Sequence, residues 1–158
     1  MSKAMAAKIE QICIHWFRKG LRTHDNPSLR HCLKFAQDND GTKVVPLFII
    51  DPHFQDPSYV GYNRMNFLME TLTDLDTVLK EKGLGLFVAK GNPDDVFRKL
   101  NSKFNISLLT FERETVEPYG KVRDDKIREF CKKNKITIES EATHTLFDQH
   151  VLWEKNDY

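Results

Sequence analysis

The stretch that most constrains the fold is residues 12–28, ICIHWFRKGLRTHDNPS. Residues 12–17 are an almost uninterrupted apolar run, too short for a globular helix and rich in β-branched and aromatic side chains, which predicts a buried strand. The cationic turn RKG follows, and its glycine tolerates positive φ. Asp25 and Asn26 then form a capping pair before a proline, where a helix is expected to begin. This is the opening unit of an open α/β sheet.

The rest of the chain repeats the alternation of strand and helix. Further strands are predicted at residues 43–50, 84–89, 106–111 and 136–139, with helices at 61–82, from 93, and at 118–134. Pro46 removes a backbone donor within the second strand, which predicts a bulge or an irregular stretch there. Because parallel strands need helix-length crossovers, we expect a doubly wound α/β domain with a five-stranded parallel, Rossmann-like sheet.

The apolar spacing also assigns the buried faces of two helices. The long helix after residue 61 is expected to bury Met65, Leu68, Met69, Leu72, Leu75 and Leu79. The helix after residue 118 is expected to turn Tyr119, Val122, Ile127, Phe130 and Cys131 inward.

Composition excludes several classes of protein. The net charge of +1 does not mark the whole chain as a nucleic-acid binder, although a local basic patch stays open. No apolar run approaches membrane-spanning length, so we expect no membrane association. The three cysteines are interpreted as small buried hydrophobes, and neither they nor the histidines have the spacing of a metal site. There is no GxxxxGK, GxSxG or HExxH motif, and we assign no catalytic residue.

Polar and aromatic residues follow the predicted strands, where open α/β sheets bind their ligands. They are Trp16, Phe17, Arg18 and Lys19 after the first strand, Phe48 and Asp51 after the second, Lys90 and Gly91 after the third, and Glu112, Arg113, Glu114 and Glu117 after the fourth. Residues of these kinds suit the binding of a planar ligand with polar edges. They are equally typical of a solvated surface on which the charged side chains form weak ion pairs and bind nothing. The carboxylate pairs Asp94–Asp95 and Asp124–Asp125 are interpreted as first-turn or surface charge.

Five blocks of the sequence carry a family resemblance. WFRKGLRTHDNPSL, VVPLFIIDP, GYNRMNFLMETLTDLD, TVEPYGKVRD and SEATHTLFD, in this order and spacing, resemble the N-terminal α/β domain of the cryptochrome/photolyase family. GYNRM and IREFCKK look most like the light-sensing animal cryptochromes, whereas HWFRKGLR is shared with (6-4) photolyases.

The resemblance implies a two-domain flavoprotein of which this sequence holds one domain. Residues 1–11 are expected to be a flexible N-terminus, 12–141 the α/β domain, and 142–158 the start of the connector to a helical domain. In the family that helical domain binds FAD and, in photolyases, damaged DNA. It is missing from this sequence, so we expect the chain alone neither to carry the flavin nor to repair DNA.

The α/β domain of the family holds an optional antenna chromophore, a deazaflavin or a folate. By position, the resemblance assigns Arg18, Lys19, Asp51 and Glu117 to the antenna rim. Thr115 replaces a family acid, and Gly20 stands where several antenna-binding photolyases have aspartate; both departures argue against antenna binding.

Four further residues belong to the strongest family blocks but are given structural roles. Asp25 and Asn26 are expected to cap the first helix, and Arg22 and Arg64 to pair with Asp25, Asp51 or Glu70.

Two functions of the full-length protein follow from the resemblance. One is a cryptochrome, a blue-light photoreceptor and circadian clock regulator in cytoplasm and nucleus, acting through clock or signalling proteins. The other is a (6-4) photolyase, a light-dependent DNA lyase for which this domain would serve as the antenna domain. A free-standing nucleotide- or flavin-binding domain is a third interpretation, and the lack of a glycine-rich phosphate loop argues against it.

Overall fold

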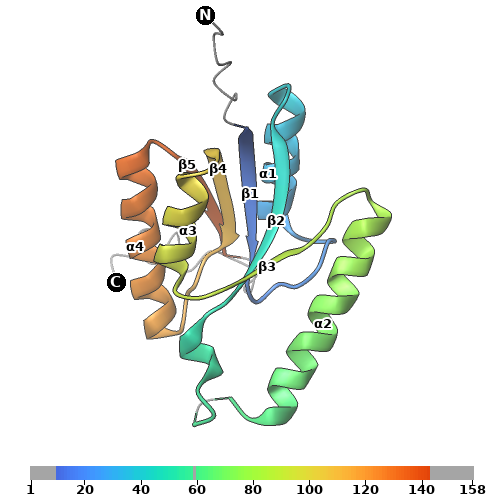
Figure 1. Cartoon of the computed structure of the whole chain (residues 1–158), viewed down its shortest axis with the longest axis vertical. Helices are drawn as coiled ribbons and strands as arrows, with labels where there is room; N and C mark the ends of the chain where they lie inside the picture. Colours follow the sequence, from blue (N-terminus) through green and yellow to red (C-terminus); the bar gives the residue numbers. More distant parts are fainter. Residues whose placement is uncertain (1–9, 59, 143–158) are drawn as a thin grey trace, which may run out of the picture.

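The computed structural model describes residues 10–58 and 60–142, which form a five-stranded parallel sheet flanked by helices (Figure 1). The strands are β1 (Gln11–Phe17), β2 (Lys43–Ile50), β3 (Phe87–Lys90), β4 (Asn105–Glu112) and β5 (Thr137–Glu141). Their order across the sheet is β3-β2-β1-β4-β5, and every neighbouring pair is parallel. The predicted doubly wound class is confirmed.

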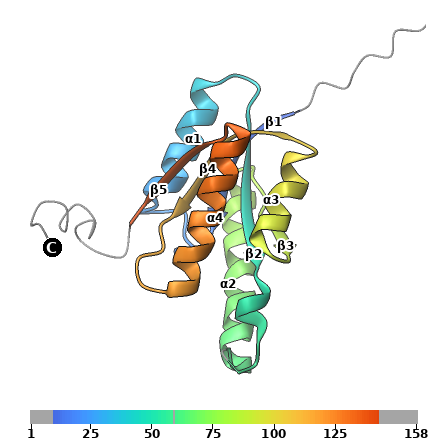
Figure 2. The same cartoon turned by 90° about the vertical axis from the view of Figure 1, so that its left-hand side faces the viewer.

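Two helices cover each face of the sheet (Figures 1 and 2). The helices are α1 (Pro27–Asp38), α2 (Tyr62–Glu81), α3 (Pro93–Asn101) and α4 (Pro118–Asn134), with a 3₁₀ turn η1 (Pro52–Gln55). On one face Ile14 and Trp16 of β1 pack with Phe97 of α3 and Ile127 of α4. On the other, Phe17 packs against residues of α1 and α2. This alternation along β1 follows from the two-residue period of a strand.

The helix starts follow the predicted capping chemistry, with one correction. The Asn26 side chain accepts a hydrogen bond from the Leu29 N–H and caps α1. Asp25 was expected to share this role but has a φ of 44° and makes no cap. Asn92 and Glu117 cap α3 and α4 in the same way, whereas Gly61 begins α2 without a side-chain cap.

The strand predictions were wrong in two places. The third strand was expected at residues 84–89 but β3 begins at Phe87, because Leu84 and Leu86 pack against the α1–α2 core before the ladder starts. Pro46 was expected to cause a bulge or an irregular stretch in the second strand, yet β2 pairs with β1 in continuous register through it. The missing N–H is tolerated because β3 pairs with β2 only from Leu47 onward.

Two residues expected on buried helix faces are exposed instead. Met69 of α2 and Val122 of α4 are 47% and 55% exposed, because each lies at the margin of a stripe whose centre already fills the core. Leu72, Leu75 and Leu79 are buried as predicted. The three cysteines are also buried and form no disulfide, which confirms their interpretation as small core residues.

The predicted terminal segments lie largely outside the described residues. Residues 1–9 of the expected flexible N-terminus and residues 143–158 of the expected connector are not described. Within residues 10–58 and 60–142, no helix combines the length and apolar character needed to cross a membrane.

Candidate functional site

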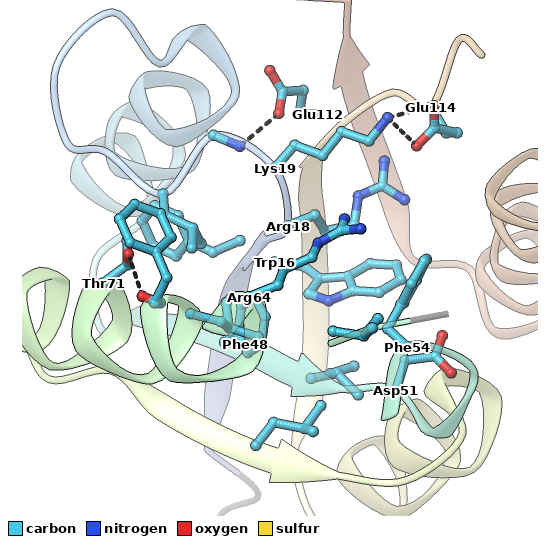
Figure 3. Close-up of a pocket in the computed structure, with 18 of the residues that line it drawn as sticks. Trp16, Arg18, Lys19, Phe48, Asp51, Phe54, Arg64, Thr71, Glu112 and Glu114 are labelled. Atoms are coloured by element: carbon cyan, nitrogen blue, oxygen red, sulfur yellow. Dashed lines mark hydrogen bonds and ion pairs between the residues drawn. The ribbon is translucent and has the colours of Figure 1, made fainter. Parts of the chain in front are cut away.

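A pocket of about 580 Å³ lies at the carboxyl ends of β1, β2 and β4. The order of winding reverses between β1 and β4, so this is the crevice where open α/β sheets bind ligands. The volume falls within the range of small-molecule sites. In Figure 3 Lys19, Glu112 and Glu114 lie along one rim, Asp51 and Phe54 lie on another side, and the Trp16 indole lies between them. Most residues of the predicted rim line this pocket, whose base is aromatic, but Lys90, Gly91 and Glu117 do not line it.

Arg18 makes the strongest internal contact at the strand ends. Its two guanidinium nitrogens donate to both carboxylate oxygens of Asp124 on α4, one of them at 3.1 Å, and both side chains are nine-tenths buried. Arg123 donates to Asp124 at 3.3 Å and lies 4.0 Å from Asp51. Both guanidinium groups stack on the Trp16 ring, at 4.9 and 5.0 Å from its centroid.

Asp124 therefore corrects a sequence prediction. It was interpreted as surface charge together with Asp125, but it is only 3% exposed. The first turns of α4 place it beneath the end of β1, where it neutralises two buried cations. The only sequence signal was that Asp124 is the last residue of the TVEPYGKVRD block.

Lys19 pairs with a buried carboxylate on the loop after β4. Its Nζ donates to Glu114 at 2.7 Å, and the Glu114 Oε1 atom also accepts from the N–H groups of Thr115, Val116 and Glu117. Burial raises the pKa of Glu114, but the Lys19 and backbone hydrogen bonds outweigh it and lower this pKa to about 2. Glu114 is thus ionised and already engaged at neutral pH.

Two glycines allow these carboxylates to approach. The Gly20 N–H donates to Glu112 at 2.9 Å, and a Cβ at Gly20 would lie 3.1 Å from the same carboxylate oxygen. An aspartate at position 20 would therefore face Glu112. A Cβ at Gly120 would lie 2.6 Å from Cγ of Glu114, so any side chain at position 120 would have to displace Glu114.

Asp51 is tied to α4 by Tyr119. The Tyr119 hydroxyl donates to the Asp51 carboxylate at 2.8 Å, and burial followed by this hydrogen bond raises the pKa of Tyr119 to about 12. The His53 ring stacks on Tyr119 at 3.7 Å, and the Phe54 ring meets the same tyrosine edge-on. This aromatic group fixes η1 as a wall of the pocket.

The predicted rim residues thus divide. Arg18, Lys19 and Asp51 line the pocket, whereas Glu117 is not among its lining residues. The Glu117 carboxylate instead accepts from the N–H groups of Tyr119 and Gly120 at the start of α4. A role in ligand binding stays a prediction for all four. The sequence reasoning did not assign Phe54 or Arg123 to this region, and it named Tyr119 only as an inward-facing residue of its helix.

Helix α2 supplies the opposite wall, with a cation, Arg64, that has no ion-pair partner among the described residues. Arg64 and Phe67 line the pocket from its first two turns, and Phe67 is 69% exposed. The predicted ion pairs of Arg64 with Asp51 or Glu70 are absent within the described residues, where Glu70 accepts from Asn66. Arg22, also at the pocket, donates to the Asp25 backbone oxygen, and its buried Nε has no partner in the described part of the chain.

Comparison with known proteins identifies the family. Residues 13–158 match the profile of the family described as DNA photolyase. The chain belongs to the cryptochrome/photolyase family. It is 42% identical over 143 residues to cryptochrome-1 of Erithacus rubecula and 43% identical over 148 residues to cryptochrome-1 of Aedes aegypti. Each alignment covers 90% of this chain but only 22% and 26% of those proteins.

Solved structures agree with this assignment. An archaeal photolyase from Sulfolobus tokodaii, whose structure holds two FAD molecules that were taken to imply a novel light-harvesting cofactor, superposes with a TM-score of 0.74 and 26% identity over 91% of this chain and 34% of that one. A cryptochrome from Synechocystis superposes with a TM-score of 0.75 at 24% identity over 85% of this chain and 28% of that one, which supports the fold. The five-stranded parallel fold is therefore that of the N-terminal domains of this family.

Proposed function

We propose that this chain is the N-terminal α/β module of a cryptochrome, a blue-light photoreceptor that signals through protein partners. The observation that carries the proposal is the 41–43% identity to relatives named cryptochrome-1 from birds, mammals and a mosquito, against 26% to the archaeal photolyase. The chain spans about a quarter of the length of those relatives, and we propose the light response for a protein of their full length. Circadian clock proteins as partners, and residence in cytoplasm and nucleus, are part of this proposal.

The strand ends of this chain do not fit the flavin of such a photoreceptor. A pyrophosphate needs free cations or uncapped helix N–H groups. Arg18 and Arg123 are already neutralised by Asp124, and the first N–H groups of α1, α3 and α4 are capped by side chains. We therefore propose that the photochemical FAD is not bound at these strand ends, and we assign it no step here.

A second function, the antenna domain of a (6-4) photolyase, is favoured by the pocket itself. An aromatic base at Trp16 and Phe48 suits a planar chromophore with an anionic group, because Arg64 lies beside it and has no ion-pair partner in the part of the chain that the structure describes. The Glu114 carboxylate beside the same pocket already accepts from Lys19 and three backbone N–H groups, and Glu112 accepts from Gly20, which argues against a ligand that needs both carboxylates as acceptors.

The two functions are separated by experiments on the full-length protein. Cryptochrome function predicts blue-light-dependent binding of partner proteins and no reversal of a (6-4) lesion. Light-driven repair of that lesion would instead establish the photolyase.

The chain itself offers a cofactor test. The purified 158-residue chain is expected to show no flavin absorbance, and a stoichiometric co-purifying flavin would contradict our assignment. Adding a deazaflavin, a folate or FAD and measuring fluorescence quenching tests the antenna. Loss of that quenching in Arg64→Gln would place the chromophore in the pocket.

A further inference from the structure

Helices α3 and α4 end side by side near the amino-terminal ends of the strands, away from the pocket at their carboxyl ends (Figures 1 and 2). Exposed basic residues gather at these two ends. We call this surface the α3–α4 basic end, and its members are Arg98, Lys99, Lys103, Lys132, Lys133 and Lys135.

A hydrogen bond holds the two helix ends together. The Asn101 side chain donates to the Asn134 side-chain oxygen at 3.1 Å, joining the last residue of α3 to the last residue of α4. Lys103 lies in the turn after α3, where its N–H donates to the Leu100 carbonyl. Lys135 lies directly after Asn134, in a left-handed conformation with φ of 57°. The cations therefore belong to one surface rather than to two separate helices.

Few acids neutralise this surface. Glu129 lies 4.0 Å from Lys133, and both side chains are more than 70% exposed, so this pair is weak. The acids of α3, Asp94 and Asp95, lie in its first turn at the far end of the helix. The other five cations have no ion pair within the described residues.

Helix-end electrostatics accounts for only part of the cluster. The carbonyl ends of helices favour cations in the last turn. This effect explains the positions of Arg98 and Lys99 in α3 and of Lys132 and Lys133 in α4. Lys103 and Lys135 lie beyond the helices, and they extend the positive surface across both ends. A chain whose net charge is +1 thus concentrates six cations on one edge.

The surface lacks the means to recognise bases. The large exposed apolar side chains among the described residues lie on α2, on β3, in the loop before α4, and at Val122 in the first half of α4. Phe104 and Phe130, the nearest aromatic rings in the sequence, pack against the core. Single-stranded nucleic acids are bound mainly by stacking on exposed rings, whereas a duplex is held through its phosphates.

We propose that the α3–α4 basic end binds the phosphate backbone of double-stranded DNA without reading its sequence. The surface offers several point charges and no stacking platform, which matches a contact to phosphates alone. This contact is independent of the pocket and of any lesion, and it lies on the module described here rather than on the helical domain of the family.

The test is binding of a fluorescent, undamaged DNA duplex to the 158-residue chain, measured by anisotropy at several salt concentrations. We expect a Kd of about 10⁻⁴ to 10⁻⁶ M that weakens steeply with salt. The triple variant Lys99→Gln, Lys103→Gln, Lys132→Gln should bind at least about 10-fold more weakly. Its slope of log K against log salt should be shallower by about 3, since each lost phosphate contact removes about 0.9.

The control removes the same charge elsewhere. Lys34, Lys82 and Lys90 are exposed and lie outside the basic end, and their triple change to Gln should alter binding less than about two-fold. Equal losses in the two triple variants would overturn the proposal, as would absence of duplex binding by the unmodified chain. Equal or tighter binding of polyglutamate would instead assign the surface to acidic proteins, and tighter binding of single-stranded DNA would contradict a phosphate-only contact. None of these results depends on the photoreceptor proposal.

Discussion

The strand ends and helix α2 border the same pocket, but the cations at the strand ends form ion pairs and the cation on α2 does not among the described residues. At the strand ends Arg18 and Lys19 are held by Asp124 and Glu114, and both acceptors are at least nine-tenths buried. On α2, Arg64 has no partner within the described residues and is exposed. The difference teaches that a cation after a strand is not by itself a ligand contact. The strand ends are built to hold the domain together, and the α2 wall is left available.

This comparison also explains why residues predicted to bind an antenna chromophore form contacts within the domain instead. Asp51 accepts from Tyr119 and Glu117 caps α4, so these two carboxylates likewise serve the packing of α4 and η1 against the sheet. If the comparison is right, substitutions at the strand ends change stability, and substitutions on α2 change binding alone.

Asp124→Asn should give the largest loss of stability. It removes the charge that neutralises Arg18 and Arg123, and stranding a buried cation costs about 3–5 kcal/mol of the free energy of unfolding. Asp125→Asn is the matched control, because Asp125 is exposed and should change stability by less than about 0.5 kcal/mol. Urea denaturation compares the two, and equal effects would return Asp124 to the surface role first expected.

Gly120→Ala should destabilise although alanine is the better helix former. The new Cβ would lie 2.6 Å from Cγ of Glu114, and relieving this overlap is expected to cost about 1–3 kcal/mol. The control is Gly85→Ala, whose Cβ meets no atom within 4 Å. If Gly120→Ala instead raised the midpoint temperature of thermal unfolding, Glu114 and its loop could move aside without cost, which would contradict this prediction.

Glu114→Gln should lose about 1–2 kcal/mol at neutral pH, because the amide keeps one acceptor but not the charge that pairs with Lys19. The pKa of Glu114 is lowered from 4.5 to about 2 in the folded chain, so the unfolded chain takes up the proton first as pH falls. The stabilisation is therefore complete above about pH 4.5 and is lost as pH decreases toward 2.

The measurement is the difference in unfolding free energy between the unmodified chain and Glu114→Gln at a series of pH values. We expect that difference to shrink below pH 4.5. A difference that stays constant down to pH 3 would contradict the ionised, hydrogen-bonded carboxylate.

Arg64→Gln should change stability least, by less than about 0.5 kcal/mol, since Arg64 has no internal partner in the described chain. Arg18→Gln is its counterpart at the strand ends and should destabilise strongly, because Asp124 would lose its bidentate partner. Thermal unfolding of both variants tests the comparison directly. Similar losses in the two would mean that α2 is also held by its cation.

Much of the fold followed from local pattern. The alternation of short apolar runs with helix-length segments predicted a parallel sheet, because such connections are long enough only for crossovers. Proline at the first helical position and asparagine before it located α1 and α3, since capping is decided within three or four residues. The late start of β3 and the regular path through Pro46 escaped prediction because both depend on which strand lies alongside.

The partners of the candidate site residues were even harder to predict from the sequence. Arg18 and Asp51 could be placed at one edge of the sheet from the ends of their strands. Their partners Asp124 and Tyr119 lie 106 and 68 residues away along the chain. No spacing rule connects residues so distant.

The elements, the parallel class of the sheet and the family could be predicted from the amino-acid sequence, because each depends on local periodicity or on contiguous blocks of residues. Which charged side chains form ion pairs is visible only in the folded chain, because a charge pairs with whatever the packing of helices brings within about 4 Å. Asp124 and Asp125 are adjacent in sequence, yet one is buried between two arginines and the other faces solvent. That division follows from the way α4 packs beneath the end of β1.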